Sequence, residues 1–244
     1  MDGSQQGIPE RSAPQGVSQQ GTPAAVNPAG AGQFKALSGA ATAATVLISL
    51  AVVRDAVVTA GNWRLYLVVH DYLAGRVTAA EVEATDTDTL ATLASWPSFL
   101  IWLAAGVVFI VWLRRARLNA ELTSGAAAHR RSRSWVVGGW VAPVANLWVP
   151  YQVVSDIWRA GAPRRSAPVT LVTAWWVLFA AATFIVKPIQ WRMAAQFADE
   201  QDVLTNAYLS TLLTGLYLAA GLLVVLIIRR ITAWQTQGHV RNTG

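Results

Sequence analysis

The sequence predicts an all-α protein that crosses a membrane four times. Of its 244 residues, 54% are hydrophobic and only 13% are charged, whereas soluble domains carry about 25% charged residues. The hydrophobic residues form long blocks, and four blocks approach or exceed the roughly 18 to 20 residues that a helix needs to cross a bilayer core. A transmembrane β-barrel would instead show short segments of alternating polarity.

These four blocks define the predicted membrane domain, residues 34–235. The spans are expected at about 36–58, 90–113, 169–186 and 208–228. Residues 1–33 are rich in Gln, Gly, Ser, Pro and Ala. They carry too few large apolar side chains to offset the entropy of ordering, so a disordered tail is predicted. Residues 236–244 form a short polar tail.

The charges predict how the spans are oriented. Residues 114–134, 159–168 and 229–244 together hold twelve Arg and one acidic residue, Glu121. The connecting segments 59–89 and 187–204 hold four basic and eight acidic residues. By the positive-inside rule, both termini are expected in the cytoplasm. The Arg, Ala and Val content is typical of GC-rich bacterial genomes, so the membrane is expected to be a bacterial plasma membrane. Because topology explains the net charge of +6, no nucleic-acid partner is expected.

The segment 135–158 does not fit the pattern of a fifth span. It is hydrophobic, but three Arg precede it (Arg130, Arg131, Arg133) and three follow it (Arg159, Arg164, Arg165). A spanning helix normally has its basic flank on one side only. The segment is therefore expected to re-enter the membrane or lie on its surface, and a fifth crossing remains the alternative.

Gly and Pro residues interrupt this central segment. Gly138 and Gly139 weaken a helix but permit close approach of backbones. Proline removes a backbone donor and disfavours a helix interior. We expect a short helix, a break from Pro143 to Pro150 that contains Asn146, and a second helix from Tyr151 to Arg159. In that second helix Asp156 and Arg159, three residues apart, are expected to pair.

Three stretches of the sequence resemble a known family. They read FIVWLRRARLNAE (109–121), HRRSRSWVVGGWVAPVANLWVPYQVVSDIWRA (129–160) and AWWVLF (174–179). They strongly resemble the actinobacterial membrane proteins called "domain of unknown function 4328", over roughly residues 40–235. The resemblance implies an integral membrane protein with a variable cytoplasmic N-terminal region and no established activity, so no catalytic residue is carried over.

The positions that match the family's motif are the candidate site. They are Arg115, Arg117, Asn119, Trp135, Gly139, Trp140, Pro143, Asn146, Trp148, Pro150, Asp156 and Trp158. Asn119 is expected to cap or end the cytoplasmic extension of the second span.

The sequence shows no constellation typical of an enzyme. It has no Cys, and its three His lie in separate segments, so no metal or other cofactor is expected. His129, beside Arg130, is expected to be a solvated loop residue. Motifs for phosphate binding, serine hydrolysis or zinc proteolysis do not occur. A non-enzymatic protein is therefore expected.

Three hypotheses about the function of this protein remain. The leading interpretation is a membrane scaffold or recruitment protein, with anionic lipid headgroups at its Arg-rich loops and a cytoplasmic protein partner bound by the N-terminal tail. The alternative is a small transporter or channel that uses 135–158 as a re-entrant element, with a polar cavity reaching Asn146 and Arg117. A third hypothesis, a lipid-modifying enzyme, rests on Asp156.

Overall fold

The described part of the chain is entirely helical where it has regular structure, as predicted. The computed structural model describes residues 2–3, 33–84, 87–163 and 168–243, with side chains except those of 84–98 and 242–243. The predicted disordered tail falls almost wholly outside these residues, as do Arg164 and Arg165. Residues 32–244 form one compact unit.

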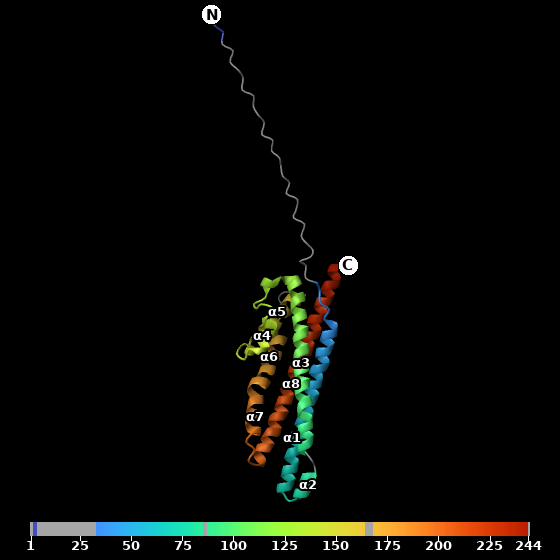
Figure 1. Cartoon of the computed structure of the whole chain (residues 1–244), viewed down its shortest axis with the longest axis vertical. Coiled ribbons are helices and arrows are strands. Elements are labelled where there is room, and N and C mark those ends of the chain that lie inside the picture. Colours follow the sequence, from blue (N-terminus) through green and yellow to red (C-terminus); the bar gives the residue numbers. More distant parts are fainter. Residues whose placement is uncertain (1, 4–32, 85–86, 164–167, 244) are drawn as a thin grey trace. The chain divides into compact units, whose positions relative to one another are not determined.

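Within the described residues, four helical rods are long and apolar enough to cross a membrane: Ser38–Leu73, Phe99–Ser124, Thr170–Ala194 and Glu200–Arg241. They belong to α1 (Ser38–Leu73), α3 (Thr87–Ser124), α6 (Thr170–Ala180) with its continuation α7 (Lys187–Ala194), and α8 (Glu200–Thr243). Each overlaps one predicted span, which confirms four helices able to span a membrane. α1 packs against both α3 and α8, and α6 packs against α8 (Figure 1).

The third rod contains a π-helical turn, η4 (Ala181–Val186), between α6 and α7. Pro188 follows it and lies at the start of α7. A proline inside a helix lacks the N–H donor, and its ring clashes with the carbonyl four residues earlier, here that of Phe184. A wider π turn relieves such a clash, so we attribute η4 to Pro188.

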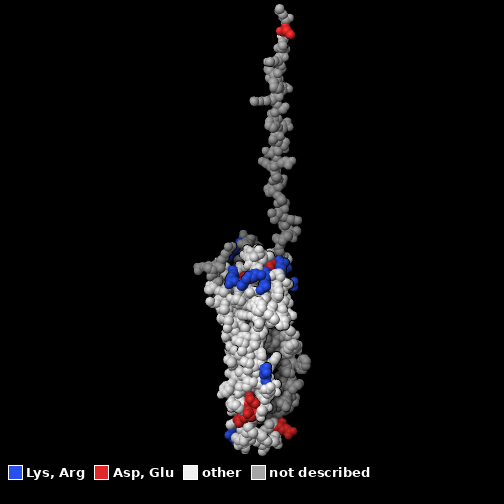
Figure 2. Space-filling view, turned by 90° about the vertical axis from the view of Figure 1, so that its left-hand side faces the viewer, with Lys and Arg blue, Asp and Glu red and all other residues white. Residues whose placement is uncertain are grey.

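Charge separates the two ends of the bundle. Lys and Arg gather over one end, hereafter the basic end, while Asp and Glu gather at the other (Figure 2). The opposite end includes α2 (Ala79–Ala84), which begins with a capping box: the Thr78 N–H donates to the Glu81 carboxylate at 2.7 Å, and the Glu81 N–H donates to the Thr78 hydroxyl at 3.4 Å. The Thr78 hydrogen bonds lower the pKa of Glu81.

The central segment folds as a helical hairpin. It comprises α4 (Trp135–Val141), the 3₁₀ turn η3 (Ala145–Leu147) and α5 (Val149–Gly161). The expected break is confirmed. Pro150 was expected to end it, but α5 already begins at Val149. Pro150 therefore lies in the first turn of α5, where its missing N–H is least costly.

Two contacts show that this segment returns to the end from which it came. Arg131, before α4, donates from Nε to the Gln152 side-chain oxygen of α5 at 2.9 Å. At the turn, the Trp176 Nε1–H donates to the Leu147 carbonyl at 3.1 Å. Trp176 lies six residues beyond the start of α6, so the turn reaches roughly 9 Å along that helix at 1.5 Å per residue. The segment therefore enters and leaves at the basic end (Figure 1).

Gly139 allows α4 and α5 to pack this closely. A Cβ at position 139 would lie 2.7 Å from the Val149 Cγ1, whereas a Cβ at Gly138 would meet only the Trp135 ring at 3.9 Å. The Gly-Gly pair thus contains one glycine that packing requires and one that it does not.

We predict opposite effects of Gly139→Ala and Gly138→Ala on thermal unfolding in detergent. The first forces α4 and α5 apart, and overpacking of this kind costs about 1–3 kcal/mol. The second removes a helix-weakening glycine without a clash, so stability should stay equal or rise by up to about 1 kcal/mol. Equal melting temperatures for the two variants would contradict this role of Gly139.

Candidate functional site

At the basic end, Asp156 joins the two ends of the hairpin. Its carboxylate accepts the Arg130 backbone N–H at 2.9 Å and the Arg130 guanidinium at 2.8–2.9 Å. The Arg159 guanidinium lies 3.8 Å away, which confirms the predicted Asp156–Arg159 pair. Asp156 is buried, and its two oxygens are satisfied by these partners. It therefore acts as a structural clasp and offers no free carboxylate for chemistry.

A second buried carboxylate, Glu121, joins α3 to the loop before α4. The Arg117 Nε donates to one of its oxygens at 2.7 Å, and the Arg133 Nε donates to the other at 2.6 Å. Arg117 is only 2% exposed and also donates to the Arg131 carbonyl at 2.8 Å. Sequence reasoning did not select Glu121, although its position four residues after Arg117 on a helix was a usable signal.

His129 is buried beside this network, so the expectation of a solvated loop residue was wrong. Its Nε2 lies 3.4 Å from the Ser124 hydroxyl. Burial and the Arg117 charge lower the pKa of His129, while Asp156 and Glu121 oppose the shift. The loop folds back over α3 because Asp156 and Arg117 anchor the two residues that follow this histidine, Arg130 and Arg131.

Asn119 fastens the chain that leads into α1. Its amide accepts from the Lys35 N–H and donates to the Lys35 carbonyl, both at 2.8 Å. Arg115 donates to the neighbouring Ala36 carbonyl at 3.2 Å. The expectation that Asn119 caps or ends the helix was wrong, because α3 continues to Ser124. The amide instead binds the chain before α1.

The aromatic candidates lie on several sides of the hairpin. Trp158 is buried and packs edge-on against Trp234 of α8, with ring centroids 4.7 Å apart. Trp135 lies beneath the Arg131 guanidinium at 5.7 Å. Trp140 packs against Phe109, Trp176 and Phe179. Trp148, just before α5, is 43% exposed.

The two remaining candidates lie in the break, where Pro143 is exposed and the Asn146 side-chain oxygen is buried without a hydrogen-bond partner. The twelve candidates thus form a charge network, a clamp on the chain before α1 and a set of aromatic supports. They do not converge on one pocket.

Two cavities lie near these residues. One, of about 260 Å³, is lined by apolar and aromatic side chains from α1, α3, α4, α6 and α8. The other, of about 440 Å³, lies at the basic end and is lined in part by Trp158, Trp234 and Arg230. Neither is lined by Asn146 or Arg117, so neither is the polar cavity expected for a transporter. Within the described residues, no group of three His, Asp or Glu is placed to hold a metal ion.

Sequence reasoning missed a polar cluster inside the spans. Thr59 of α1 bonds the Thr214 hydroxyl of α8 at 2.8 Å, and the amides of Asn62 and Gln190 both donate to the Ser210 hydroxyl, at 2.5 and 2.6 Å. Asp55 lies beside it, buried and paired with Arg54 at 2.6 Å. The signal was a polar stripe at helical spacing, with Asp55, Thr59 and Asn62 on one helix and Ser210 and Thr214 on the other.

Together the fold and site define an all-α protein with four helices able to span a membrane and a helical hairpin clasped at its basic end. A family model described as a domain of unknown function (DUF4328) matches residues 76–233. The chain belongs to this family. The match begins after α1, which the resemblance had been expected to include. No curated protein and no solved structure matched the chain.

We predict that Arg117→Met destabilises the protein by about 3 kcal/mol, because removing one partner of a buried ion pair leaves the other charge without its partner. Arg133 still pairs with Glu121, so the loss should fall at the lower end of the usual range. The matched control is Arg115→Met on the exposed face of the same turn, for which a change within about 0.5 kcal/mol is expected. Thermal unfolding in detergent measures both. Similar losses for the two variants would show that the buried Arg117, which pairs with Glu121 and binds the Arg131 carbonyl, does not stabilise this end of the fold.

Proposed function

We propose that this protein is a non-enzymatic scaffold of the bacterial plasma membrane, whose basic end faces the cytoplasm and binds anionic lipid headgroups. The observation that carries the proposal is how the charges at that end are used. Glu121 and Asp156 are buried and already paired. These two carboxylates neutralise the arginines that they bind. Other exposed arginines nearby are left without an acidic partner.

Three exposed arginines lie within α3 and α8, where the apolar part of each helix ends. Arg114, Arg229 and Arg230 are exposed, and the structure gives them no hydrogen bond or ion pair with any described residue. Arg114 and Arg229 each directly follow a long apolar stretch, which places them at the headgroup level. Each basic residue near an anionic membrane surface contributes about 1 kcal/mol of attraction.

The 440 Å³ cavity strengthens the proposal at one of these residues. Arg230 lines it together with Trp158 and Trp234. Trp is favoured at the membrane interface because its ring is apolar and its N–H is polar. A guanidinium bonds phosphate oxygens through paired N–H groups. Arg230 and the two rings thus suit a phosphate-bearing headgroup at the membrane surface.

Recruitment of a cytoplasmic protein is the second part of the proposal. It is supported by the composition of residues 1–33, which predicts a disordered tail of the kind that can bind partners. The positive-inside rule supports a cytoplasmic location for this tail.

One observation favours a transporter as the second candidate. Ionisable residues within a membrane span are rare and often mark a path for ions or substrates. Thr214, next to Asp55, lies fifteen residues from Arg229 along α8, or roughly 22 Å at 1.5 Å per residue. The Asp55 cluster is therefore inside the apolar core, on the side away from the basic end. Water-accessible cysteines at Thr59 and Thr214 would favour this candidate, and inaccessible ones would count against it.

The scaffold proposal predicts selective loss of anionic lipid from the variant Arg229→Gln/Arg230→Gln. The full chain is purified from vesicles of equal phosphatidylglycerol and phosphatidylcholine, and native mass spectrometry counts the retained lipids. Two lost charges, at about 1 kcal/mol each, reduce the preference for the anionic lipid by up to ~30-fold. The control is Arg64→Gln/Arg192→Gln, two exposed arginines in the parts of α1 and α7 towards the opposite end, which should retain the preference.

An unchanged preference in the first variant would contradict headgroup binding. Recruitment is tested by purifying the chain from cell membranes with and without residues 1–33. The truncated chain should insert as before but lose its co-purifying cytoplasmic proteins. The same co-purifying proteins with and without the tail would contradict that part.

A further inference from the structure

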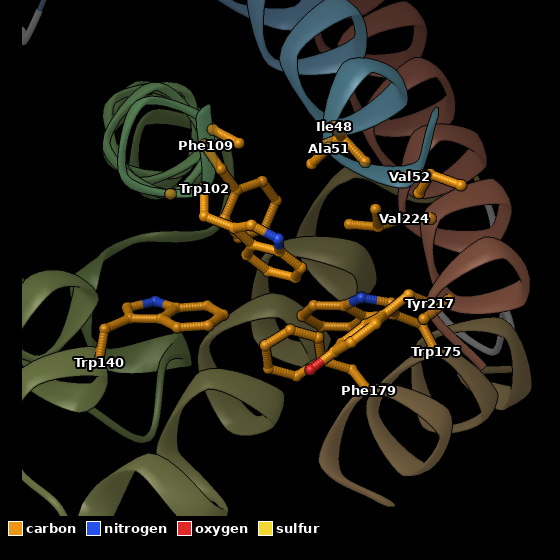
Figure 3. Close-up of a pocket in the computed structure, with 14 residues that line it drawn as sticks. Ile48, Ala51, Val52, Trp102, Phe109, Trp140, Trp175, Phe179, Tyr217 and Val224 are labelled. Atoms are coloured by element: carbon orange, nitrogen blue, oxygen red, sulfur yellow. The ribbon is translucent and has the colours of Figure 1, made fainter. Parts of the chain in front are cut away.

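The 260 Å³ cavity is a built feature of the membrane domain. Six aromatic side chains surround it: Trp102, Phe109, Trp140, Trp175, Phe179 and Tyr217. Figure 3 shows Trp102 and Phe109 extending from one helix towards the rings of Trp140 and Trp175 on the other side of the space. Voids larger than a water molecule are few in close-packed protein interiors, so a space of this size needs an explanation.

Water does not suit this cavity, because its lining is almost wholly apolar. A buried water needs two to four polar partners, and an engineered apolar cavity of about 150 Å³ stays dry yet binds benzene. The present cavity is larger and lies between helices that span the membrane. Its natural occupant is therefore a hydrocarbon group.

Two glycines line the cavity. A Cβ added at Gly106 would meet no atom within 4 Å, and one at Gly221 would touch the Val52 side chain at 3.1 Å. Gly106 lines the cavity and is also exposed on the surface of α3. The cavity thus reaches the outer surface of the bundle at a residue without a side chain, where lipid chains surround the protein.

The cavity lies just below the exposed arginines. Phe109 and Val224, which line it, precede Arg114 and Arg229 by five residues on their helices. Five residues correspond to about 7.5 Å of helix. A lipid whose phosphate lies at the level of these arginines would have its hydrocarbon chain beginning at the depth of the cavity.

We propose that the aromatic cavity holds one hydrocarbon chain of an anionic membrane lipid whose headgroup is bound at the basic end. The headgroup part of this proposal rests on the proposed function, whereas the hydrocarbon-chain part rests on the cavity itself. Because the surrounding phase is also hydrocarbon, selectivity comes from packing against the rings rather than from the hydrophobic effect.

The proposal also gives the family motif a purpose. Trp140 is the only residue of the hairpin formed by α4 and α5 that lines the cavity. The tight contact of Gly139 with Val149 sets the position of α4, and that position carries the next residue, Trp140, to the cavity wall. The hairpin re-enters the membrane, on this view, to close one side of a lipid-chain site.

Photolabelling tests the proposal on the full chain. The protein is reconstituted into vesicles that contain phosphatidylglycerol with a diazirine in the middle of one acyl chain, and the labelled peptides are mapped. Labels are expected on the cavity-lining parts of α3, α4 and α6. Gly106→Leu should fill the cavity and reduce this labelling several-fold, and Gly106→Ala should reduce it less. The matched control is Gly215→Leu, also exposed and open but outside the cavity lining, which should leave labelling unchanged.

Two outcomes separate this proposal from the proposed function. Labelling that Gly106→Leu leaves unchanged would overturn the chain site, even if the arginine variants still lose anionic lipid. If a phosphatidylcholine probe labels the cavity equally and Gly106→Leu abolishes both signals, the chain site is supported and headgroup selection is contradicted.

Discussion

The structure depends on one buried carboxylate. Asp156 binds both the backbone N–H and the guanidinium of Arg130, and so holds the start of the central segment against its end. A buried carboxylate cannot leave these partners without a large desolvation penalty. The segment must therefore turn within the membrane domain and come back. Its helices α4 and α5 then pack around Gly139, and Trp140 meets Phe109 and Trp176 beside the cavity.

The same electrostatic logic explains how one end of the protein can carry so many arginines. Four of them are used by Glu121 and Asp156, in pairs that lie partly or wholly inside the fold. These pairs organise the loop before α4 without neutralising the outer surface. The arginines that follow the apolar parts of α3 and α8 stay exposed. In the proposed function they face the headgroup region, where a hydrophobic body and a basic rim together suit an anionic amphiphile.

Local sequence signals predicted much of the fold. Apolar length indicated the four spanning helices, and the basic residues on both flanks of 135–158 indicated its return. The Asp156–Arg159 pair was also evident, because it follows from helical spacing. Other contacts were not evident from the sequence, since they join residues from different elements. These are the burial of His129, the binding of Arg133 by Glu121 and the clamp of Asn119 on Lys35. The cavity was hidden for the same reason: its rings come from distant helices, and the absence of a side chain at Gly106 has no local signature.

The most direct test of this structure uses the lack of cysteine in the chain. Single cysteines at Ser132 and Ala162, on the two flanks of the hairpin, are exposed in turn to a membrane-impermeant thiol reagent on right-side-out and inverted vesicles. A cysteine at Ala74, after α1 at the opposite end, serves as the reference. The clasped hairpin predicts that positions 132 and 162 react from the same side and position 74 from the other. Reaction of positions 132 and 162 from opposite sides would mean that the segment crosses the membrane and would contradict the central role of Asp156.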